Sequence, residues 1–383
     1  MEWRIPLADI DFGPEEEDAV LQVIKSRWLT MGAVTQAFEE EFAAYAGARH
    51  AIAVANGTAA LHLACLAAGL RAGDEVIVPA LTFVATANAV RYTGARPVFA
   101  DITSEHDLNI SPATIESCLT PRTRAVIVMH YGGYPCDMPG IMALAKKHDL
   151  VVIEDAAHAV GSLLDERMMG TWGSIGCFSF FSNKNMTTGE GGMLVTDDDA
   201  LAGKLHALRS HGMTTLTWDR HKGHAWSYDV VALGYNYRLD EIRAALGRVQ
   251  LGRLNNNNDR RRQLTALYRE HLQELIPSVG IPFGSHRGIS ACHLMPVLLP
   301  TGTDRTAFME QMKARGVQTS IHYPPIHKFS AYRNIVAQMS PNLGITEEVA
   351  GREVTLPLYP TLTEADVELV TRSVLESLMH VTS

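Results

Sequence analysis

Residues 177–198 read CFSFFSNKNMTTGEGGMLVTDD and place Lys184 between two apolar runs. The runs IGCFSFF (175–181) and GGMLV (191–195) predict two buried strands. The turn between them is then expected at an edge of a sheet, where loops carry functional residues. A lysine held at such an edge loses part of its hydration and can become a nucleophile.

Upstream of this stretch, short apolar runs alternate with helix-length segments. The runs are apolar throughout, which favours strands that are buried on both faces. They are HAIAVA (50–55), DEVIVP (74–79), RPVFADI (96–102), RAVIVMH (124–130) and LVVIED (150–155). The segments GTAALHLACLAAGL (57–70) and TFVATANAVRYTG (82–94) have helical patterns. The alternation predicts an α/β fold with a parallel sheet covered by helices on both faces.

Downstream, the pattern changes after one long amphipathic segment, residues 239–275, which predicts a helix leading out of the large domain. Beyond it we expect the strands HLMPVLL (293–299) and VQTSIHY (317–323) and the helices DRTAFMEQMKARG (304–316) and TEADVELVTRSVLESL (363–378). We therefore predict a large α/β domain over residues 1–245 and a smaller α+β domain over residues 246–383. The N-terminal segment is expected to pack on the smaller domain.

Composition excludes several classes of function. The 33 basic and 42 acidic residues give a net charge of −9 without any run of Lys or Arg, which argues against nucleic acid and anionic membranes as partners. Five cysteines without CxxC spacing lie mostly in apolar runs, which indicates buried thiols and a cytoplasmic location. No apolar segment approaches the ~18 residues of a membrane helix, and no N-terminal signal core is present.

The segment ANGTAALHLA (55–64) follows a predicted strand and opens a predicted helix, with Asn56 or Thr58 as its N-cap. Unpaired backbone N–H groups and the helix dipole make such a helix start suitable for a phosphate. The alternative is a capped helix without a ligand. No Walker lysine follows, so a nucleoside-triphosphate loop is not expected.

The segment VVIEDAAHAVGS (151–162) places Glu154 and Asp155 at the end of a strand, which is the ligand-binding edge of a parallel sheet. A carboxylate there could hold a cationic ring nitrogen by a charge-assisted hydrogen bond. The alternative is that the acids cap a helix. His158, three residues on, is expected on the same face of a following helix turn and could reach the same ligand, or it is an ordinary surface residue.

Four further segments carry weaker signals. GTWGSIG (170–176) precedes a strand instead of following one, so we interpret it as a turn. HKGH (221–224) has no third ligand nearby, so we expect a solvated loop and no metal site. Asn236 and Arg238 in GYNYRLDEIRAAL precede a helix, and His322 and His327 in SIHYPPIH flank two prolines in a rigid turn. Helix capping and surface charge explain these residues as well as a ligand does.

A nucleophilic lysine, an acid for a ring nitrogen and a helix N-terminus for a phosphate are together the parts that bind pyridoxal 5′-phosphate (PLP). Their order resembles that of the fold-type I aminotransferases. The sequence is similar over nearly its whole length to the DegT/StrS family of nucleotide-sugar aminotransferases, from LTMGAVTQAFEEEFAAYAG (29–47) to EVTLPLYPTLTEADVELV (353–370). FSFFSNKNMTTGEGGM (178–193) is similar to the perosamine-synthase-like branch, which aminates C4 of a GDP-linked keto sugar.

The resemblance implies a mostly parallel seven-stranded sheet covered by helices, PLP or its amine form PMP as cofactor, and roles for individual residues. Lys184 would form the Schiff base and shuttle the proton, and Asp155 would keep the pyridine nitrogen protonated. The other cofactor-binding positions are Phe83 against the ring, His158 beside the ring hydroxyl, the N–H groups of Thr58 and Ala59 and the Ser179 hydroxyl at the phosphate, and Asn236 reaching the phosphate from a second subunit.

The resemblance also implies the substrates. A homodimer with shared active sites would move an amino group from L-glutamate, or from L-glutamine, to a keto group of a nucleotide-linked deoxysugar in ping-pong order. Candidate substrate-binding residues are Thr30, Arg238, His322, Tyr323 and His327. The rivals are a keto-cyclitol acceptor and a catalytically silent binding or regulatory homologue.

Two positions refine the comparison with the family. Related 3-dehydratases replace the lysine by histidine, so Lys184 favours transamination. The family often has an aromatic residue before the histidine of HL in the small domain, whereas this chain reads SACHLMP with Cys292. We therefore expect the packing of the small domain to differ there.

Overall fold

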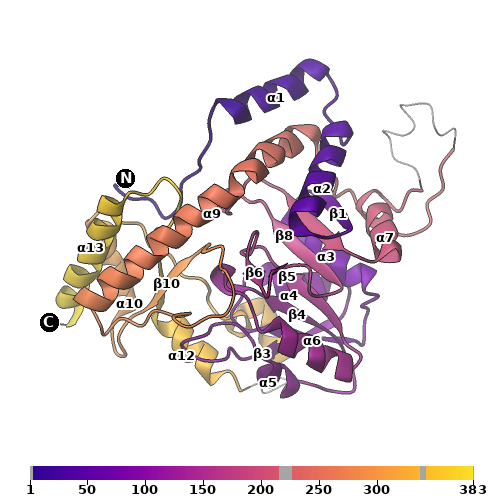
Figure 1. Cartoon of the computed structure of the whole chain (residues 1–383). Coiled ribbons are helices and arrows are strands. Elements are labelled where there is room, and N and C mark those ends of the chain that lie inside the picture. The colour runs from indigo at the N-terminus through magenta and orange to yellow at the C-terminus, as the bar shows by residue number, and fades with distance from the viewer. Residues whose placement is uncertain (1–2, 215–226, 337–341, 383) are drawn as a thin grey trace.

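A seven-stranded sheet forms the centre of the fold in the computed structural model, which describes residues 3–214, 227–336 and 342–382 (Figure 1). The strands in spatial order are β1 (His50–Val54), β9 (Gly192–Thr196), β8 (Ile175–Ser179), β5 (Val151–Asp155), β4 (Thr123–Met129), β2 (Glu75–Pro79) and β3 (Arg96–Ala100). Each predicted run of the large domain forms one of these strands. The α/β class is confirmed.

The sheet is mostly parallel, as predicted. Strands β8, β5, β4, β2 and β3 pair in parallel, while β9 runs antiparallel to both β1 and β8. In the register of the central strands, Asp155 pairs with Met129 on one side and with Cys177 on the other. The carboxyl ends of β4 and β5 and the middle of β8 therefore lie together, which positions the site described below.

Helices cover both faces of the sheet. Those of the first part of the chain are α1 (Pro14–Ser26), α2 (Ala33–Ala46), α3 (Gly57–Ala67), α4 (Val84–Tyr92), α5 (Pro112–Glu116), α6 (Met138–Lys147) and α7 (Asp199–Arg209). One apolar layer joins the sheet to α2, α6 and the start of the long helix α9 (Glu241–Leu275), and a second joins it to α3, α4 and α7. In the first layer the rings of Phe42 and Phe178 meet edge to face with centroids 5.1 Å apart.

The remaining elements gather around the C-terminal half of α9, which runs diagonally from α2 to α13 in Figure 1. They are β10 (Met295–Leu298), α10 (Arg305–Ala314), α12 (Gly344–Arg352), β11 (Glu353–Leu356) and α13 (Glu364–Thr382), whereas α11 (Arg333–Val336) packs against the apolar layer of α3 and α4. Short pieces complete the chain: the hairpin β6 (Leu163–Leu164) and β7 (Arg167–Met168), and the 3₁₀ turns η1 (Tyr131–Gly133), η2 (Ile326–Lys328) and η3 (Ser330–Tyr332).

Helix α9 runs without a break through the predicted domain boundary at residue 245, so that division stays a prediction. The N-terminal segment lies against the C-terminal part of the chain, because Ile5 bridges Val317 and joins the same apolar cluster as β10 and β11. Cys292 is buried in this cluster with a left-handed backbone, at φ 46°.

The predicted strand over residues 317–323 is wrong. Only two isolated bridges form there, from Val317 to Ile5 and from Ser320 to Thr355. The N–H of His322 donates to the side chain of Glu353 (2.8 Å) instead of to a neighbouring strand, and two prolines follow, so a ladder cannot continue.

Within the described ranges, no helix has the length and hydropathy to cross a membrane. The same part of the chain contains no group of three or more His, Cys, Asp or Glu side chains that could hold a metal ion. The HKGH segment (221–224), named above for its histidines, lies outside the described residues.

Candidate active site

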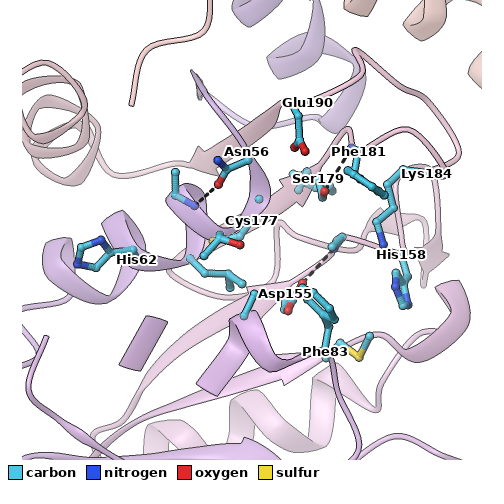
Figure 2. A pocket seen from close by; sticks show the side chains of 18 of the residues that line it. Asn56, His62, Phe83, Asp155, His158, Cys177, Ser179, Phe181, Lys184 and Glu190 are labelled. Carbon is cyan, nitrogen blue, oxygen red and sulfur yellow. Dashed lines mark hydrogen bonds between the residues drawn. The ribbon is translucent and has the colours of Figure 1, made fainter. Parts of the chain in front are cut away.

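A cavity of about 650 Å³ opens at the carboxyl end of β5, beside the N-terminus of α3 (Figure 2). Most of the site residues expected from the sequence line it: Thr58, Ala59, Phe83, Asp155, His158, Ser179, Lys184, His322 and Tyr323. They come from segments up to 265 positions apart, from Thr58 to Tyr323. Figure 2 shows Lys184, Asp155 and His158 around the same space.

Asp155 is buried at the floor of this cavity. One carboxylate oxygen accepts a hydrogen bond from the Thr86 hydroxyl (2.7 Å), and the other accepts one from the N–H of Ala157 (3.2 Å). Thr86 in turn lies 2.9 Å from the hydroxyl of Thr82. Burial raises the pKa of the Asp155 carboxyl, while the Thr86 hydrogen bond and the charge of Lys184 oppose the rise. A cation placed against this carboxyl would complete its hydrogen bonding and favour the ionised form.

Lys184 enters the cavity from the turn between β8 and β9. Its backbone N–H donates to the carbonyl of Phe181 (2.9 Å), which closes the turn. Burial lowers the pKa of the Lys184 amine from 10.5 to about 8, and the nearby Asp155 carboxylate limits the fall. An appreciable fraction of the amine is therefore neutral near pH 7, and a neutral amine is the nucleophilic form.

The residue after the lysine anchors this turn. The Asn185 amide donates to the side-chain oxygen of Asn258 (2.7 Å) and to the carbonyl of Ala291 (2.8 Å). Its own oxygen lies 2.8 Å from Nδ1 of His293. Asn258 belongs to the run of four asparagines in α9, and His293 belongs to SACHLMP, so two segments without an assigned role in the sequence hold the lysine turn in place.

The N-terminus of α3 forms another wall. Asn56 is its N-cap and accepts the N–H of Ala59 (2.8 Å). The N–H groups of Gly57 and Thr58 have no hydrogen-bond partner among the described residues. A Cβ atom on Gly57 would lie 2.8 Å from Cβ of Ser179, so only glycine lets β8 approach the helix end this closely. The result is a polar recess open to an anion, with the Ala59 N–H already taken.

His158 lies in an irregular turn after β5, so the helix turn expected there is wrong. Its Nδ1 accepts the backbone N–H of Gly132 (3.3 Å). This tertiary contact holds the ring in place in the turn, where no helix forms. Nε2 must then carry the ring proton, and it donates to the hydroxyl of Tyr323 (3.0 Å). Burial lowers the pKa of His158 well below 6.5, so the ring is neutral.

Phe83 stands at the mouth of the cavity with 53% of its surface exposed. Its ring is tilted against that of Tyr323, with centroids 5.7 Å apart. A planar ligand could cover this exposed face.

The other expected site residues do not line the cavity of this chain. Thr30 and Asn236 are exposed, and Arg238 bridges Val54 through its backbone with its side chain partly buried. His327 is buried on η2 and its Nε2 lies 3.0 Å from the Glu347 carboxylate.

Glu154 points away from the cavity. Its oxygens accept the N–H groups of Gly173 (2.6 Å) and Gly170 (2.7 Å) and face Nε2 of His130 (3.0 Å). The GTWGSIG segment is therefore a turn, as predicted, and Glu154 holds it. Neither acid caps a helix.

Sequence reasoning missed several cavity residues. Thr86 lies buried behind the cavity wall and binds Asp155, and the aromatic side chains of His62, on α3, and of Tyr237 line the cavity. The pair Thr82 and Thr86 has helical spacing, but threonines at this spacing carry no signal for a carboxylate partner.

Comparisons with known proteins show which sequences and folds this chain resembles. The model of the DegT/DnrJ/EryC1/StrS aminotransferase family matches residues 11–375. The spore coat polysaccharide biosynthesis protein SpsC of Bacillus subtilis is 41% identical over 377 residues, which cover 97% of this chain and 95% of SpsC.

Two solved structures superpose over nearly the whole chain. Helicobacter pylori PseC, an aminotransferase involved in the biosynthesis of pseudoaminic acid, superposes with a TM-score of 0.91 at 29% identity. The match covers 98% of this chain and 99% of the PseC chain. The putative sugar aminotransferase Spr1654 of Streptococcus pneumoniae, in its PLP form, superposes with a TM-score of 0.91 at 25% identity. The match covers 99% of this chain and 100% of the Spr1654 chain.

Proposed function

Because the chain belongs to the DegT/DnrJ/EryC1/StrS aminotransferase family, we propose that it transfers an amino group from L-glutamate to a keto group of a nucleotide-linked deoxysugar. The fold is that of the fold-type I PLP-dependent enzymes, and the chain is a PLP-dependent aminotransferase of the sugar-aminotransferase type. The amino donor and the keto acceptor are the proposed part. L-Glutamine is the alternative donor.

The residues of the cavity fit PLP. Asp155 is a buried carboxyl for which the described residues provide no cation at bonding distance, which suits a pyridinium nitrogen. The recess formed by Gly57, Thr58 and Ser179 suits the phosphate, and we assign its backbone donors to Gly57 and Thr58 because Asn56 already takes the Ala59 N–H. When bound, PLP supplies a conjugated ring that takes up the electrons left when Cα of the amino donor loses its proton.

The observation that carries the proposal is the single cavity that joins Lys184, Asp155 and the open end of α3. Lys184 would hold the cofactor and move the proton, since its lowered pKa makes the amine both a base and an acid near neutral pH. Asp155 would keep the opposing nitrogen protonated. The exposed ring of Phe83 would cover the face of the cofactor. The Nε2–H of His158, which now donates to Tyr323, would donate to the ring hydroxyl of the cofactor instead.

We further propose that the site is shared between two subunits. Asn236 is exposed and does not line its own cavity, and nearby Leu233 is 86% exposed, as expected of a surface that a second copy covers. Asn236 would reach the partner's phosphate, and Arg238 and Thr30 the partner's substrate. His327 is bound to Glu347, so a role for it in substrate binding has weaker support.

Mixed dimers test this sharing. A Lys184→Ala subunit and an Arg238→Ala subunit should each be inactive alone, but a mixed dimer carries both lesions in one site and leaves the other intact. Co-expression with two different tags should therefore restore part of the activity. Mixed dimers as inactive as their parents, or a monomer in sedimentation, would refute the shared site.

The acceptor is tested with the purified enzyme. L-Glutamate should convert the cofactor to its PMP form, and a GDP-linked 4-keto-6-deoxysugar should return it to PLP with an aminated sugar detected by mass spectrometry. Return by a keto-inositol but not by the nucleotide sugar would favour the cyclitol rival. No conversion by either amino donor would favour the silent homologue, and amination at C3 instead of C4 would refute the perosamine-like assignment.

A further inference from the structure

Glu353, the first residue of β11, is a fully buried carboxyl behind the cavity. One of its oxygens accepts the backbone N–H of His322 (2.8 Å), and the other lies 2.5 Å from the hydroxyl of Thr355. The part of the chain that the structure describes offers it no ion pair, and Arg305 donates to the backbone carbonyl of Glu353 (3.3 Å), not to its carboxylate. A buried carboxylate without a cation is costly, so this one needs an explanation.

A chain of hydrogen bonds connects Glu353 to the cavity. The Thr355 hydroxyl lies between the carboxyl and the imidazole of His322, 2.8 Å from its Nδ1. His322 lines the cavity that contains Lys184, and because its Nδ1 edge binds Thr355, the Nε2 edge is the one left for the cavity. Glu353, Thr355 and His322 are called the relay below.

The relay has two complete hydrogen-bond arrangements. With Glu353 ionised, Thr355 donates to the carboxylate and His322 donates its Nδ1–H to Thr355, so Nε2 is a hydrogen-bond acceptor. A proton added at Nε2 lets the Nδ1 proton pass to Thr355 and the Thr355 proton pass to Glu353. The two side-chain bonds of the relay then reverse, and Nε2–H becomes a donor, while the backbone N–H of His322 still donates to Glu353. The two states differ by one proton.

The electrostatics place this change near neutral pH. Burial raises the pKa of Glu353 to about 8, against the hydrogen bonds from Thr355 and from the His322 N–H and the charge of Arg305. Burial and Lys184 lower the pKa of His322 to about 4, so its ring is neutral in both states and only its tautomer changes. The other titratable groups that face the relay are the imidazoles of His158 and His293, whose pKa values burial lowers, and the phenols of Tyr131 and Tyr323, whose pKa values burial raises.

We propose that His322 is a specificity-determining residue whose cavity-facing nitrogen Glu353 switches between acceptor and donor, so that one side chain serves two unlike substrates. This inference rests on the proposed amino transfer from an amino acid to a sugar. A carboxylate of the amino acid needs a hydrogen-bond donor, and the donor state provides one. A hydroxyl of the sugar ring can donate to the acceptor state. The relay therefore alternates with the two half-reactions.

The tautomer of His322 tests the relay without measuring activity. Proton–nitrogen correlation spectra of the ¹⁵N-histidine-labelled holoenzyme distinguish an Nδ1–H ring from an Nε2–H ring, and the His322 signals are identified by their loss in His322→Gln. We expect the tautomer to change with a midpoint near pH 8, following Glu353. A wild-type ring that keeps one tautomer from pH 6 to 10 would overturn the relay.

Three variants sharpen this measurement. Glu353→Gln should lock the Nε2–H state, because the amide oxygen accepts the His322 N–H while the NH₂ group donates to Thr355. Thr355→Val should uncouple His322 from Glu353, whereas Thr355→Ser, which keeps the hydroxyl, should retain the switch. Thr371→Val is the matched control, since Thr371 is equally buried but bonds within α13. A Glu353→Gln ring that titrates like the wild type would overturn the assignment.

The role in specificity has its own readout. In Glu353→Gln, kcat/KM for the half-reaction with the sugar should fall ~10-fold relative to that with L-glutamate, which is the effect of one hydrogen bond. A switching tautomer with an unchanged ratio would refute the specificity role but not the relay. Absence of amino transfer altogether would refute the proposed function, and the tautomer measurement would still decide the relay.

Discussion

Glu154 and Asp155 are neighbours on β5, equally acidic and almost equally buried, yet they face different regions of the molecule. On one face of the sheet, three donors surround Glu154 and fix the turn before β8. On the other face, Asp155 borders the cavity with Lys184, and its hydrogen-bond partners within the described part of the chain are Thr86 and Ala157. Alternation along a strand places adjacent residues on opposite faces. One carboxyl is saturated by the protein itself, and the other keeps bonding capacity for a ligand.

Because of this difference, we expect Glu154 to contribute to the stability of the fold and Asp155 to contribute to catalysis. A carboxyl whose hydrogen-bond capacity is filled by the fold should affect the free energy of unfolding when it is changed. A carboxyl with remaining capacity in a cavity should affect turnover. The four predictions below test the two faces against each other.

The largest effect is expected on the cavity side, at Lys184. Lys184→Ala removes both the nucleophile and the proton carrier, so turnover should fall by at least ~10³-fold. Steady-state amino transfer measures the loss, and circular dichroism controls for folding. Borohydride reduction of the wild type should attach the cofactor to Lys184. Attachment to a different lysine, or wild-type rates in the variant, would contradict the assignment.

Asp155→Asn should reduce turnover by nearly as much as Lys184→Ala. The amide keeps the shape but not the charge that pairs with a protonated ring nitrogen, a loss of about 3–5 kcal/mol that corresponds to roughly 10²- to 5 × 10³-fold in rate. The rate of proton abstraction from Cα in the half-reaction with L-glutamate measures this effect. Near-normal rates in the variant would show that the carboxylate charge is not needed.

Glu154→Gln should lower the stability of the fold and leave turnover unchanged. Its NH₂ group must face at least one of the N–H donors of Gly170 and Gly173, so the free energy of unfolding should fall by about 2–3 kcal/mol. Urea denaturation measures the fall. Turnover per folded molecule should stay at the wild-type level, and a variant that is fully stable but inactive would reverse the interpretation of the two faces.

The smallest effect concerns the pKa of Lys184 in the cofactor-free protein. Competitive labelling with an amine reagent, followed by mass spectrometry, should give half-maximal reactivity near pH 8, because the amine is neutral above its lowered pKa and protonated below it. Asp155→Asn should move this midpoint to lower pH, since the carboxylate raises the pKa. Glu154→Gln should leave it unchanged, and equal shifts in both variants would contradict the comparison.

Hydrophobic patterning was sufficient for the elements of the fold. Every run predicted as a strand of the large domain forms a strand, and the predicted segment 239–275 forms one long helix from Glu241 to Leu275, because the spacing of apolar residues depends on local geometry. The failures have tertiary causes. Residues 317–323 do not form a strand because Glu353 takes the N–H of His322, and His158 leaves the helical path because Gly132 binds its ring.

The sequence by itself determined the α/β class, and it predicted a site at the carboxyl edge of the sheet with Lys184 and one of the adjacent acids Glu154 and Asp155. Only the tertiary structure decided which of two adjacent acids faces the cavity, that Asn56 rather than Thr58 caps α3, and that Glu353 lies two hydrogen bonds behind His322. The physical reason is the distance along the sequence over which each kind of interaction acts. Patterns of apolar residues act over a few positions, whereas a buried polar group is satisfied by partners from distant segments, as when Asn185 binds Asn258 and His293.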